Sequence, residues 1–159
     1  MKKILHVDDE KDIRAIAKLA LQSVGGFELT SCASGQEALD CVAETAPDLI
    51  MLDVMMPGMD GFEVCRRLKA DPRTAHIPVI IVTALDQPAD RVGGLEAGAD
   101  DFLTKPVDDL ALVTRVKSLV RLKTLTDELM MRAETSKEIG LDDALDPANL
   151  VGEGGRILL

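Results

Sequence analysis

Residues 49–61 read Leu49-Ile50-Met51-Leu52-Asp53-Val54-Met55-Met56-Pro57-Gly58-Met59-Asp60-Gly61, an apolar run that ends at a carboxylate and continues into a loop with proline and glycine. A continuous apolar run is typical of a strand that is buried on both faces of a parallel sheet. Open α/β sheets bind their ligands at the carboxyl ends of such strands. Asp53 therefore stands where a fold of this kind carries its chemistry.

Similar apolar runs alternate with amphipathic segments along the chain, with a period of about twenty residues. The pattern predicts strands at 4–7, 27–32, 48–52, 79–82 and 101–104, and helices at 11–24, 35–45, 61–70, 88–97 and from about 107. Right-handed helical crossovers between parallel strands produce a doubly wound α/β sheet. We expect a flavodoxin-like (βα)5 fold with five parallel strands in the order 2-1-3-4-5.

The last predicted helix is longer than this fold requires. Leucine and valine recur at steps of three and four residues from Leu112 to Leu129, with charged residues between them. This pattern fits a helix that lies on its own domain, or an interdomain or coiled-coil helix, which we favour for residues 122–138. We expect a domain at 1–122, an extension of its last helix at 123–140, a linker at 141–155 and the start of a further domain at 156–159, so that the chain is a piece of a larger protein.

Composition narrows the classes of partner. Eighteen basic and 28 acidic residues give a net charge of −10, which argues against direct binding to nucleic acid. No apolar run is long enough to span a membrane. Three irregularly spaced cysteines, without a Cys-x-x-Cys pair, argue against a zinc site or a disulfide framework and fit small buried side chains in a reducing cytosol. We therefore expect a cytoplasmic protein without a nucleic-acid or membrane partner.

Polar side chains follow four of the predicted strands. Asp8 and Asp9 follow the first strand, Asp53 the third, Thr83 the fourth and Lys105 the fifth. In the expected strand order, strands one, three and four are neighbours, so the acids and the hydroxyl meet at one edge and the ammonium group reaches in from strand five. The alternative for the first two acids is simple stabilisation of a helix N-terminus, which accounts for one acid but not for a pair that faces a third.

Three carboxylates in one pocket repel each other, and a bound cation relieves the repulsion. Ligands that are all oxygen favour Mg²⁺ or Mn²⁺ over zinc. We expect Asp9 and Asp53 to be direct ligands, the backbone carbonyl of Met55 to lie close by, and Asp8 to act through water.

Asp53 is also a candidate nucleophile, because carboxylates form acyl phosphates. Lys105 would then pair with one phosphoryl oxygen and the Thr83 hydroxyl would donate to another. A phosphatase of the haloacid dehalogenase type also uses an aspartate nucleophile, but it needs a second acid two positions later. Met55 occupies that position, so the sequence disfavours this class of enzyme. A nucleotide-binding fold is disfavoured because no glycine-rich turn follows the first strand.

Four segments together resemble the receiver domains of two-component response regulators over residues 1–122. They are His6-Val7-Asp8-Asp9-Glu10, residues 53–61, Val82-Thr83-Ala84 and Lys105-Pro106. The resemblance implies a domain that is not an enzyme beyond its own phosphorylation and dephosphorylation. Its partner would be a histidine kinase or a phosphotransfer protein, and a scaffold of the same fold that is never phosphorylated is the alternative.

The resemblance also assigns roles to residues. Asp53 would accept the phosphoryl group, Asp8 and Asp9 would carry the Mg²⁺ site, Thr83 and Lys105 would sense the phosphoryl group, and Phe102 would stand at the position of a rotating aromatic switch. It further implies a cis peptide bond between Lys105 and Pro106, and X–Pro is the one bond at which the cis form is common.

Within the family, residues 53–69 and 76–121 resemble the first receiver of PleD-type diguanylate cyclases, which implies a cyclase as a possible output domain. The motif of the cyclase itself is absent from this chain. The output face implied by the resemblance is the fourth helix, fifth strand and fifth helix, which often dimerises on activation. Side chains that would form ion pairs across such a dimer, or else a solvated charged surface, are Arg91, Asp100, Asp101 and Arg115.

The predicted fourth helix contains two adjacent glycines, Gly93 and Gly94. Each glycine costs a helix about 1 kcal/mol relative to alanine. The pair therefore predicts either a weak helix that shifts on activation or a site of close packing, and the sequence favours neither.

Overall fold

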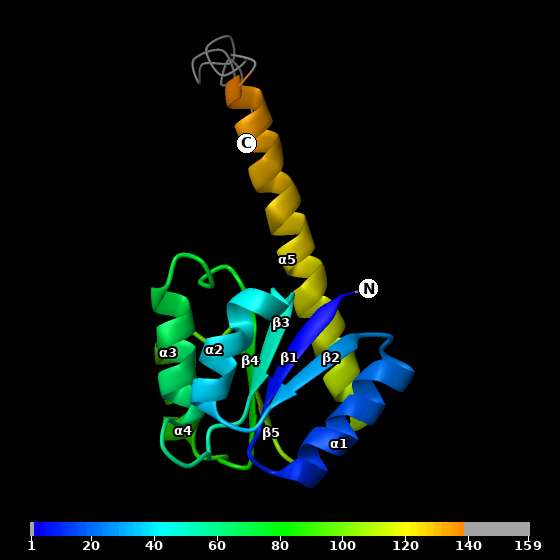
Figure 1. The fold of residues 1–159 in the computed structure, drawn as a ribbon, viewed down its shortest axis with the longest axis vertical. Coiled ribbons are helices and arrows are strands. Elements are labelled where there is room, and N and C mark those ends of the chain that lie inside the picture. The colour runs from blue at the N-terminus through cyan, green and yellow to red at the C-terminus, as the bar shows by residue number, and fades with distance from the viewer. Residues whose placement is uncertain (1, 139–159) are drawn as a thin grey trace. The chain divides into compact units, whose positions relative to one another are not determined.

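A computed structural model describes residues 2–138, with side chains to Leu129 (Figure 1). Five parallel strands form one sheet in the order β2-β1-β3-β4-β5, which confirms the predicted flavodoxin-like topology. The strands are β1 (Lys3–Val7), β2 (Glu28–Cys32), β3 (Leu49–Leu52), β4 (Val79–Thr83) and β5 (Asp101–Thr104). The helices are α1 (Lys11–Leu19), η1 (Ala20–Val24), α2 (Gly35–Thr45), α3 (Gly61–Ala70), α4 (Pro88–Glu96) and α5 (Asp109–Glu138).

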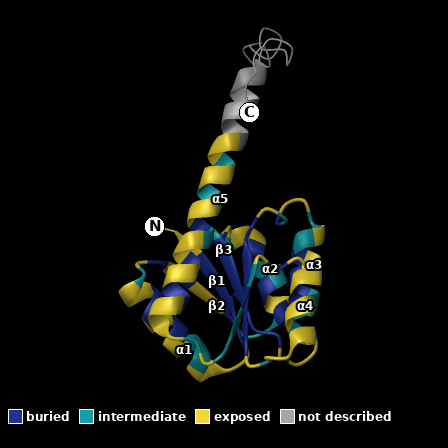
Figure 2. Ribbon diagram, turned by 180° about the vertical axis from the view of Figure 1, so that it is seen from behind, coloured by how far each residue is buried: buried dark blue, intermediate teal, exposed yellow. Residues whose placement is uncertain are grey.

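Helices cover both faces of the sheet. Alternate residues of each central strand enter two separate apolar cores, one against α2, α3 and α4 and the other against α1 and the first part of α5. Ile50 belongs to the first core and its neighbour Met51 to the second, and both are at most 2% exposed. Figure 2 shows the central strands largely in the buried colour and the outer sides of the helices in the exposed colour. Burial on both faces is the physical reason why these strands are continuous apolar runs.

The end of the first predicted helix needs a correction. Residues 11–24 do not form one α-helix, because α1 ends at Leu19 and a π-helical turn, η1, continues to Val24. In this turn the Gly25 N–H donates to the Ala20 carbonyl at 3.3 Å, five residues back. Ile16, which the periodicity places on the apolar face, is 59% exposed and borders a cavity of about 430 Å³ between α1 and α5.

The last helix extends to Glu138, which confirms the predicted long C-terminal helix. The chain divides into two units, residues 1–123 and 124–159. Leu122, Leu125 and Leu129 are each at least half exposed on α5. The interdomain or coiled-coil role of residues 122–138 stays a prediction. The end of the extension, the linker at 141–155 and the start of a further domain at 156–159 lie outside the described residues.

Candidate functional site

Backbone hydrogen bonds carry the parallel ladder one residue beyond the strands and so fix the predicted site residues. The Asp53 N–H donates to the Val7 carbonyl at 2.9 Å, and the Asp8 N–H donates to the Cys32 carbonyl at 3.1 Å. The Lys105 N–H donates to the Thr83 carbonyl at 2.7 Å. The residues that follow four different strands are therefore held at the same edge of the sheet, as the sequence predicts.

The acids gather into one cluster. Carboxylate oxygens of Asp8, Asp9, Glu10 and Asp53 all lie within 4.8 Å of one another. Asp8 is 0% exposed and Asp53 is 5% exposed, whereas Asp9 and Glu10 are exposed. Two buried carboxylates are costly unless opposite charge and hydrogen bonds compensate them.

Lys105 supplies that compensation. Its Nζ lies 2.9 Å from Asp8 Oδ2 and 3.3 Å from Asp53 Oδ2. Burial by itself lowers the pKa of Lys105, but the two carboxylates more than offset burial, and the pKa is raised above its ordinary value. The ammonium group is therefore charged at neutral pH and bridges the two buried acids.

The remaining oxygens of the buried acids accept backbone hydrogen bonds. Asp8 Oδ1 accepts from the Glu10 N–H at 2.9 Å. Asp53 Oδ1 accepts from the Val54 N–H at 2.7 Å and from the Met55 N–H at 3.4 Å. The N–H groups after Asp53 thus point toward its carboxylate, as expected for a cradle of negative charge.

Gly61 closes the loop that follows Asp53. A Cβ at this position would lie 2.2 Å from the Asp53 carbonyl oxygen, and the Gly61 N–H donates to the Val54 carbonyl at 3.0 Å. Only glycine permits this close approach of two backbone segments. Asp60 then begins α3, because its Oδ1 accepts from the Glu63 N–H at 2.9 Å. The loop conformation therefore depends on residues that the sequence reasoning did not assign to the site.

The two predicted switch residues are both buried. Thr83 is 0% exposed at the end of β4, and its Oγ1 accepts from the Leu85 N–H at 3.5 Å. Phe102 is 4% exposed, with the Arg91 guanidinium 5.1 Å from its ring centroid. A Cβ at Gly94 would lie 2.8 Å from the Phe102 ring. Gly94 is therefore a site of close packing, which is one of the two roles that the sequence predicts for the glycine pair. The mobility of α4 stays a prediction.

The donor set fits a hard divalent cation. All candidate side-chain ligands are carboxylate oxygens, with two of them solvent-exposed and able to exchange water for a metal ion. Glu10 joins the cluster although the sequence reasoning left it out; its position next to Asp9 is the signal that would have found it. The Met55 carbonyl as a ligand stays a prediction. The expected cis bond between Lys105 and Pro106 is present.

The predicted interface residues have partners within the chain. Asp101 Oδ2 pairs with Arg115 Nη1 at 2.8 Å, and Asp100 Oδ2 pairs with Lys69 Nζ at 3.0 Å. Arg91 Nη1 donates to the Phe102 carbonyl at 3.2 Å. Pairing of these four residues across a dimer stays a prediction.

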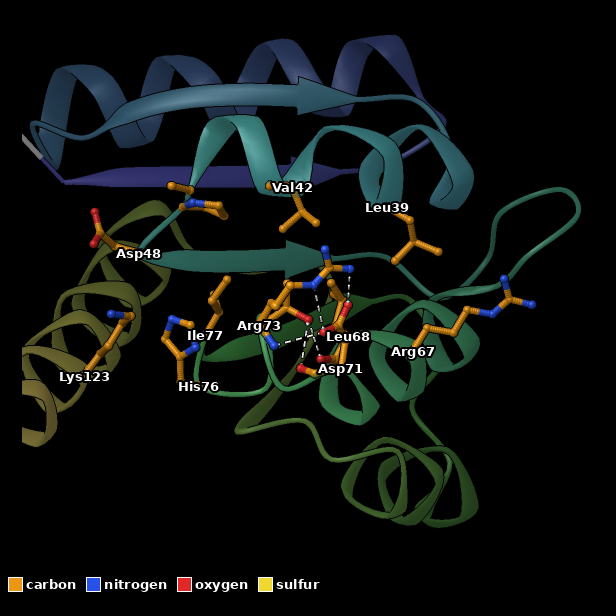
Figure 3. A pocket seen from close by; sticks show the side chains of 14 residues that line it. Leu39, Val42, Asp48, Arg67, Leu68, Asp71, Arg73, His76, Ile77 and Lys123 are labelled. Carbon is orange, nitrogen blue, oxygen red and sulfur yellow. Dashed lines mark hydrogen bonds and ion pairs between the residues drawn. The ribbon is translucent and has the colours of Figure 1, made fainter. Parts of the chain in front are cut away.

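A second cavity, of about 500 Å³, lies at the opposite edge of the sheet (Figure 3). Asp48 and Ile77, which line it, come just before β3 and β4, whereas Asp53 and Thr83 come at their ends. Leu39 and Val42 of α2 form part of its apolar wall, and none of the predicted site residues lines it. This cavity is therefore separate from the acid cluster.

The sequence matches a known protein family over most of its length. The response regulator receiver domain family matches residues 4–117. The chain belongs to this family. Receivers are signalling domains, and the matched range contains the whole acid cluster together with Thr83 and Lys105.

The chain spans only part of the length of two proteins that it resembles. "Response regulator PleD" of Caulobacter vibrioides is 50% identical over 159 residues, which are 99% of this chain and 34% of that protein. "DNA-binding dual master transcriptional regulator RpaA" of Synechocystis is 40% identical over 137 residues, 86% of this chain and 55% of that protein. The receiver thus spans about a third to a half of these relatives.

A solved structure agrees with the fold. The chemotaxis protein CheY4 of Vibrio cholerae has a TM-score of 0.71 and 31% identity, covering 75% of this chain and 98% of that one.

None of the helices in the described part of the receiver combines the length and the apolar character of a membrane span.

Proposed function

We propose that the receiver accepts a phosphoryl group on Asp53 from the phosphohistidine of a histidine kinase or phosphotransfer protein, in a reaction that needs Mg²⁺ or Mn²⁺. The observation that supports this most directly is the Lys105 ammonium group, which bridges the buried carboxylates of Asp8 and Asp53. A nucleophile, a charge partner and a cation site are thereby combined at one sheet edge.

The chemistry follows from the positions of these groups. An Asp53 carboxylate oxygen attacks phosphorus, the bond from phosphorus to the imidazole nitrogen of the donor breaks, and the imidazole keeps the electron pair. Lys105 releases Asp53 Oδ2 and pairs with a phosphoryl oxygen, while the N–H groups of Val54 and Met55 remain directed at the new acyl phosphate. Asp8, Asp9, Glu10 and Asp53 would hold the divalent cation, which would offset the negative charge of the carboxylates and the phosphoryl oxygens.

Phosphorylation then replaces the carboxylate charge of Asp53 by a phosphoryl group that carries a charge of about −1.5 to −2 and three acceptor oxygens, and Thr83 and Lys105 face this group. The Thr83 hydroxyl turns from Leu85 toward the phosphoryl group, and the space it leaves admits rearrangement of Phe102 on the adjacent strand. Thr83 and Thr104 are paired in register, so movement at the end of β4 reaches β5 directly. The output face is α4, β5 and α5.

That face is suited to a homodimer. Val92 and Leu95 of α4 are 51% and 58% exposed, and Asp101 and Arg115 lie on the neighbouring β5 and α5. The Asp101–Arg115 pair would exchange its partner within the chain for one across the dimer. Similarity to PleD favours a diguanylate cyclase as the output domain that the receiver would control. The proposal includes a cytoplasmic location, which the free thiols of the three cysteines support.

The test is intact mass after incubation with Mg²⁺ and a small phosphodonor such as phosphoramidate. The native chain gains one phosphoryl group, and both Asp53→Asn and omission of the metal abolish the gain. Asp86→Asn, which removes an exposed acid that does not belong to the cluster, serves as the control and is phosphorylated normally. An unmodified native chain under these conditions would support the scaffold alternative.

Dimerisation is tested by light scattering with beryllium fluoride and Mg²⁺. The native chain is expected to double its mass in solution, and Arg115→Ala is expected to weaken the dimer. An unchanged mass for the native chain at the highest soluble concentration rejects the dimer while leaving phosphorylation of Asp53 intact.

A further inference from the structure

Two of the three cysteines lie side by side. Cys32 Sγ at the end of β2 and Cys41 Sγ in α2 are 3.4 Å apart, although nine residues separate them in sequence. Both are free thiols. A disulfide has an S–S bond of about 2.0 Å, so the two sulfur atoms need to approach each other by only roughly 1.4 Å.

We propose that Cys32 and Cys41 form a modification site, a dithiol that a peroxide oxidises to an intramolecular disulfide. The proposal concerns a pair of side chains outside the acid cluster and does not depend on phosphorylation of Asp53.

The reaction begins at Cys41, because Cys41 is half-buried whereas Cys32 is 3% exposed. The Cys41 sulfur attacks one peroxide oxygen, the O–O bond breaks, and a sulfenic acid and one water form. The Cys32 sulfur then attacks Cys41 Sγ, the S–O bond breaks, and a second water leaves. Two thiols lose two electrons and two protons, and hydrogen peroxide is reduced to two waters.

Cys65 provides an internal comparison. It is 0% exposed, and its Sγ donates to the Ala97 carbonyl at 3.4 Å. Burial raises the pKa of Cys65 to about 11, and burial together with Cys41 raises that of Cys32 to about 12, so the pKa does not distinguish Cys65 from the pair. Position does, because the sulfur–sulfur contact among the described residues joins Cys32 to Cys41 and not to Cys65.

The dithiol is one hydrogen bond away from the acid cluster. The Cys32 carbonyl accepts from the Asp8 N–H, and Cys32 pairs in register with Val7. A disulfide would tie this strand end, which positions Asp8, to α2. Oxidation of the pair therefore adds a covalent link directly beside the cation site.

The experiment uses the whole chain. It is treated with hydrogen peroxide, free thiols are alkylated in denaturant, and the unreduced protein is cleaved after glutamate. Cleavage after Glu28, Glu37 and Glu44 separates Cys32, in residues 29–37, from Cys41, in residues 38–44. We expect these two peptides to be linked, with two hydrogen atoms less than their summed mass, and to separate on reduction. Cys65, in residues 64–96, is expected to be alkylated.

Matched variants complete the test. Cys41→Ser is expected to abolish the linked peptide, whereas Cys65→Ser and Asp53→Asn are expected to keep it at every protein concentration. Alkylation of both Cys32 and Cys41 in the native chain, further oxidation of Cys41 to a sulfinic acid instead of a link, or a disulfide that involves Cys65 or two chains would each overturn the proposal.

Discussion

Lys105 Nζ lies 3.3 Å from Asp53 Oδ2, although 52 residues separate the two in sequence. The same ammonium group lies closer, at 2.9 Å, to Asp8 Oδ2. Lys105 therefore balances two buried carboxylates, and it is in place to follow the negative charge when a phosphoryl group is added to Asp53.

Replacement of Lys105 by methionine leaves Asp8 and Asp53 without their charge partner. We expect the free energy of unfolding to fall by roughly 1–3 kcal/mol at neutral pH without metal, because buried charge is then uncompensated. Added Mg²⁺ is expected to recover more stability in this variant than in the native chain. Urea denaturation with and without Mg²⁺ measures both effects, and Lys117→Met on the exposed side of α5 is the control. A variant as stable as the native chain without metal would show that Lys105 does not balance the acids.

Asp9 carries an exposed carboxylate of the cluster. The ion pairs of Lys105 are with the two buried acids, Asp8 and Asp53. Asp9→Asn is expected to weaken Mg²⁺ binding on the order of ten-fold or more, because one charged oxygen ligand is lost. Calorimetric titration of the native chain and of Asp12→Asn, which removes an exposed acid of α1, gives the comparison. Equal affinity in native chain and Asp9→Asn would move the cation away from the proposed ligands.

The two adjacent glycines of α4 form a matched pair. A Cβ at Gly93 would lie 3.5 Å from the Phe62 ring, an ordinary contact, whereas a Cβ at Gly94 would lie 2.8 Å from the Phe102 ring. Gly93→Ala is expected to stabilise the receiver by up to about 1 kcal/mol, through helix propensity. Gly94→Ala is expected to destabilise it by about 1–3 kcal/mol, through overpacking. Thermal unfolding decides, and the same sign for both variants would contradict the packing of Phe102 on Gly94.

Hydrogen exchange addresses the mobility of the same helix. We expect the backbone amides of residues 88–97 to exchange faster than those of the central strands β1, β3 and β4. The reason is that α4 contains two glycines and that Gly94 is its one buried residue. Protection of α4 equal to that of these strands would reject a mobile α4.

His6 gives the receiver a pH dependence of its own. Burial lowers its pKa from 6.5 to about 4, and its Nδ1 has no hydrogen-bond partner among the described residues. Between these two pH values the unfolded chain binds a proton that the folded chain does not, so stability falls as pH falls from 6.5 toward 4. The loss from this group reaches roughly 3 kcal/mol by about pH 4.

Comparison of variants isolates this contribution from that of the acids. Denaturation midpoints measured from pH 7 down to pH 4 are expected to fall less steeply for His6→Leu than for the native chain. His76→Leu, at the other histidine and exposed, is expected to follow the native chain. Parallel curves for native chain and His6→Leu would contradict the buried neutral histidine.

Much of this arrangement was predictable because burial on both faces of a parallel sheet leaves a direct trace in sequence. The runs before Asp53 and Thr83 are continuous and apolar, the run before Asp8 is interrupted only by His6, and each ends at a polar residue at the sheet edge. Right-handed crossovers make the sheet doubly wound, and 2-1-3-4-5 is one of the two common strand orders of such sheets. These regularities are properties of the backbone, and a single sequence is sufficient to recognise them.

The details that were missed depend on side-chain direction and on local backbone geometry. The sequence does not show that Lys105 lies closer to Asp8 than to Asp53, or that the backbone at Gly61 touches that of Asp53. The π-helical turn of η1 likewise has no propensity signal, and the glycines at 25 and 26 mark only its end.

The central claim is that Asp53, and not another acid of the cluster, carries the phosphoryl group. Reduction of an acyl phosphate with borohydride converts the aspartate to homoserine, and peptide mass after phosphorylation with Mg²⁺ then locates it. We predict homoserine at position 53 alone. Homoserine at position 8 or 9, or no homoserine in a chain that has gained a phosphoryl group, would contradict the account.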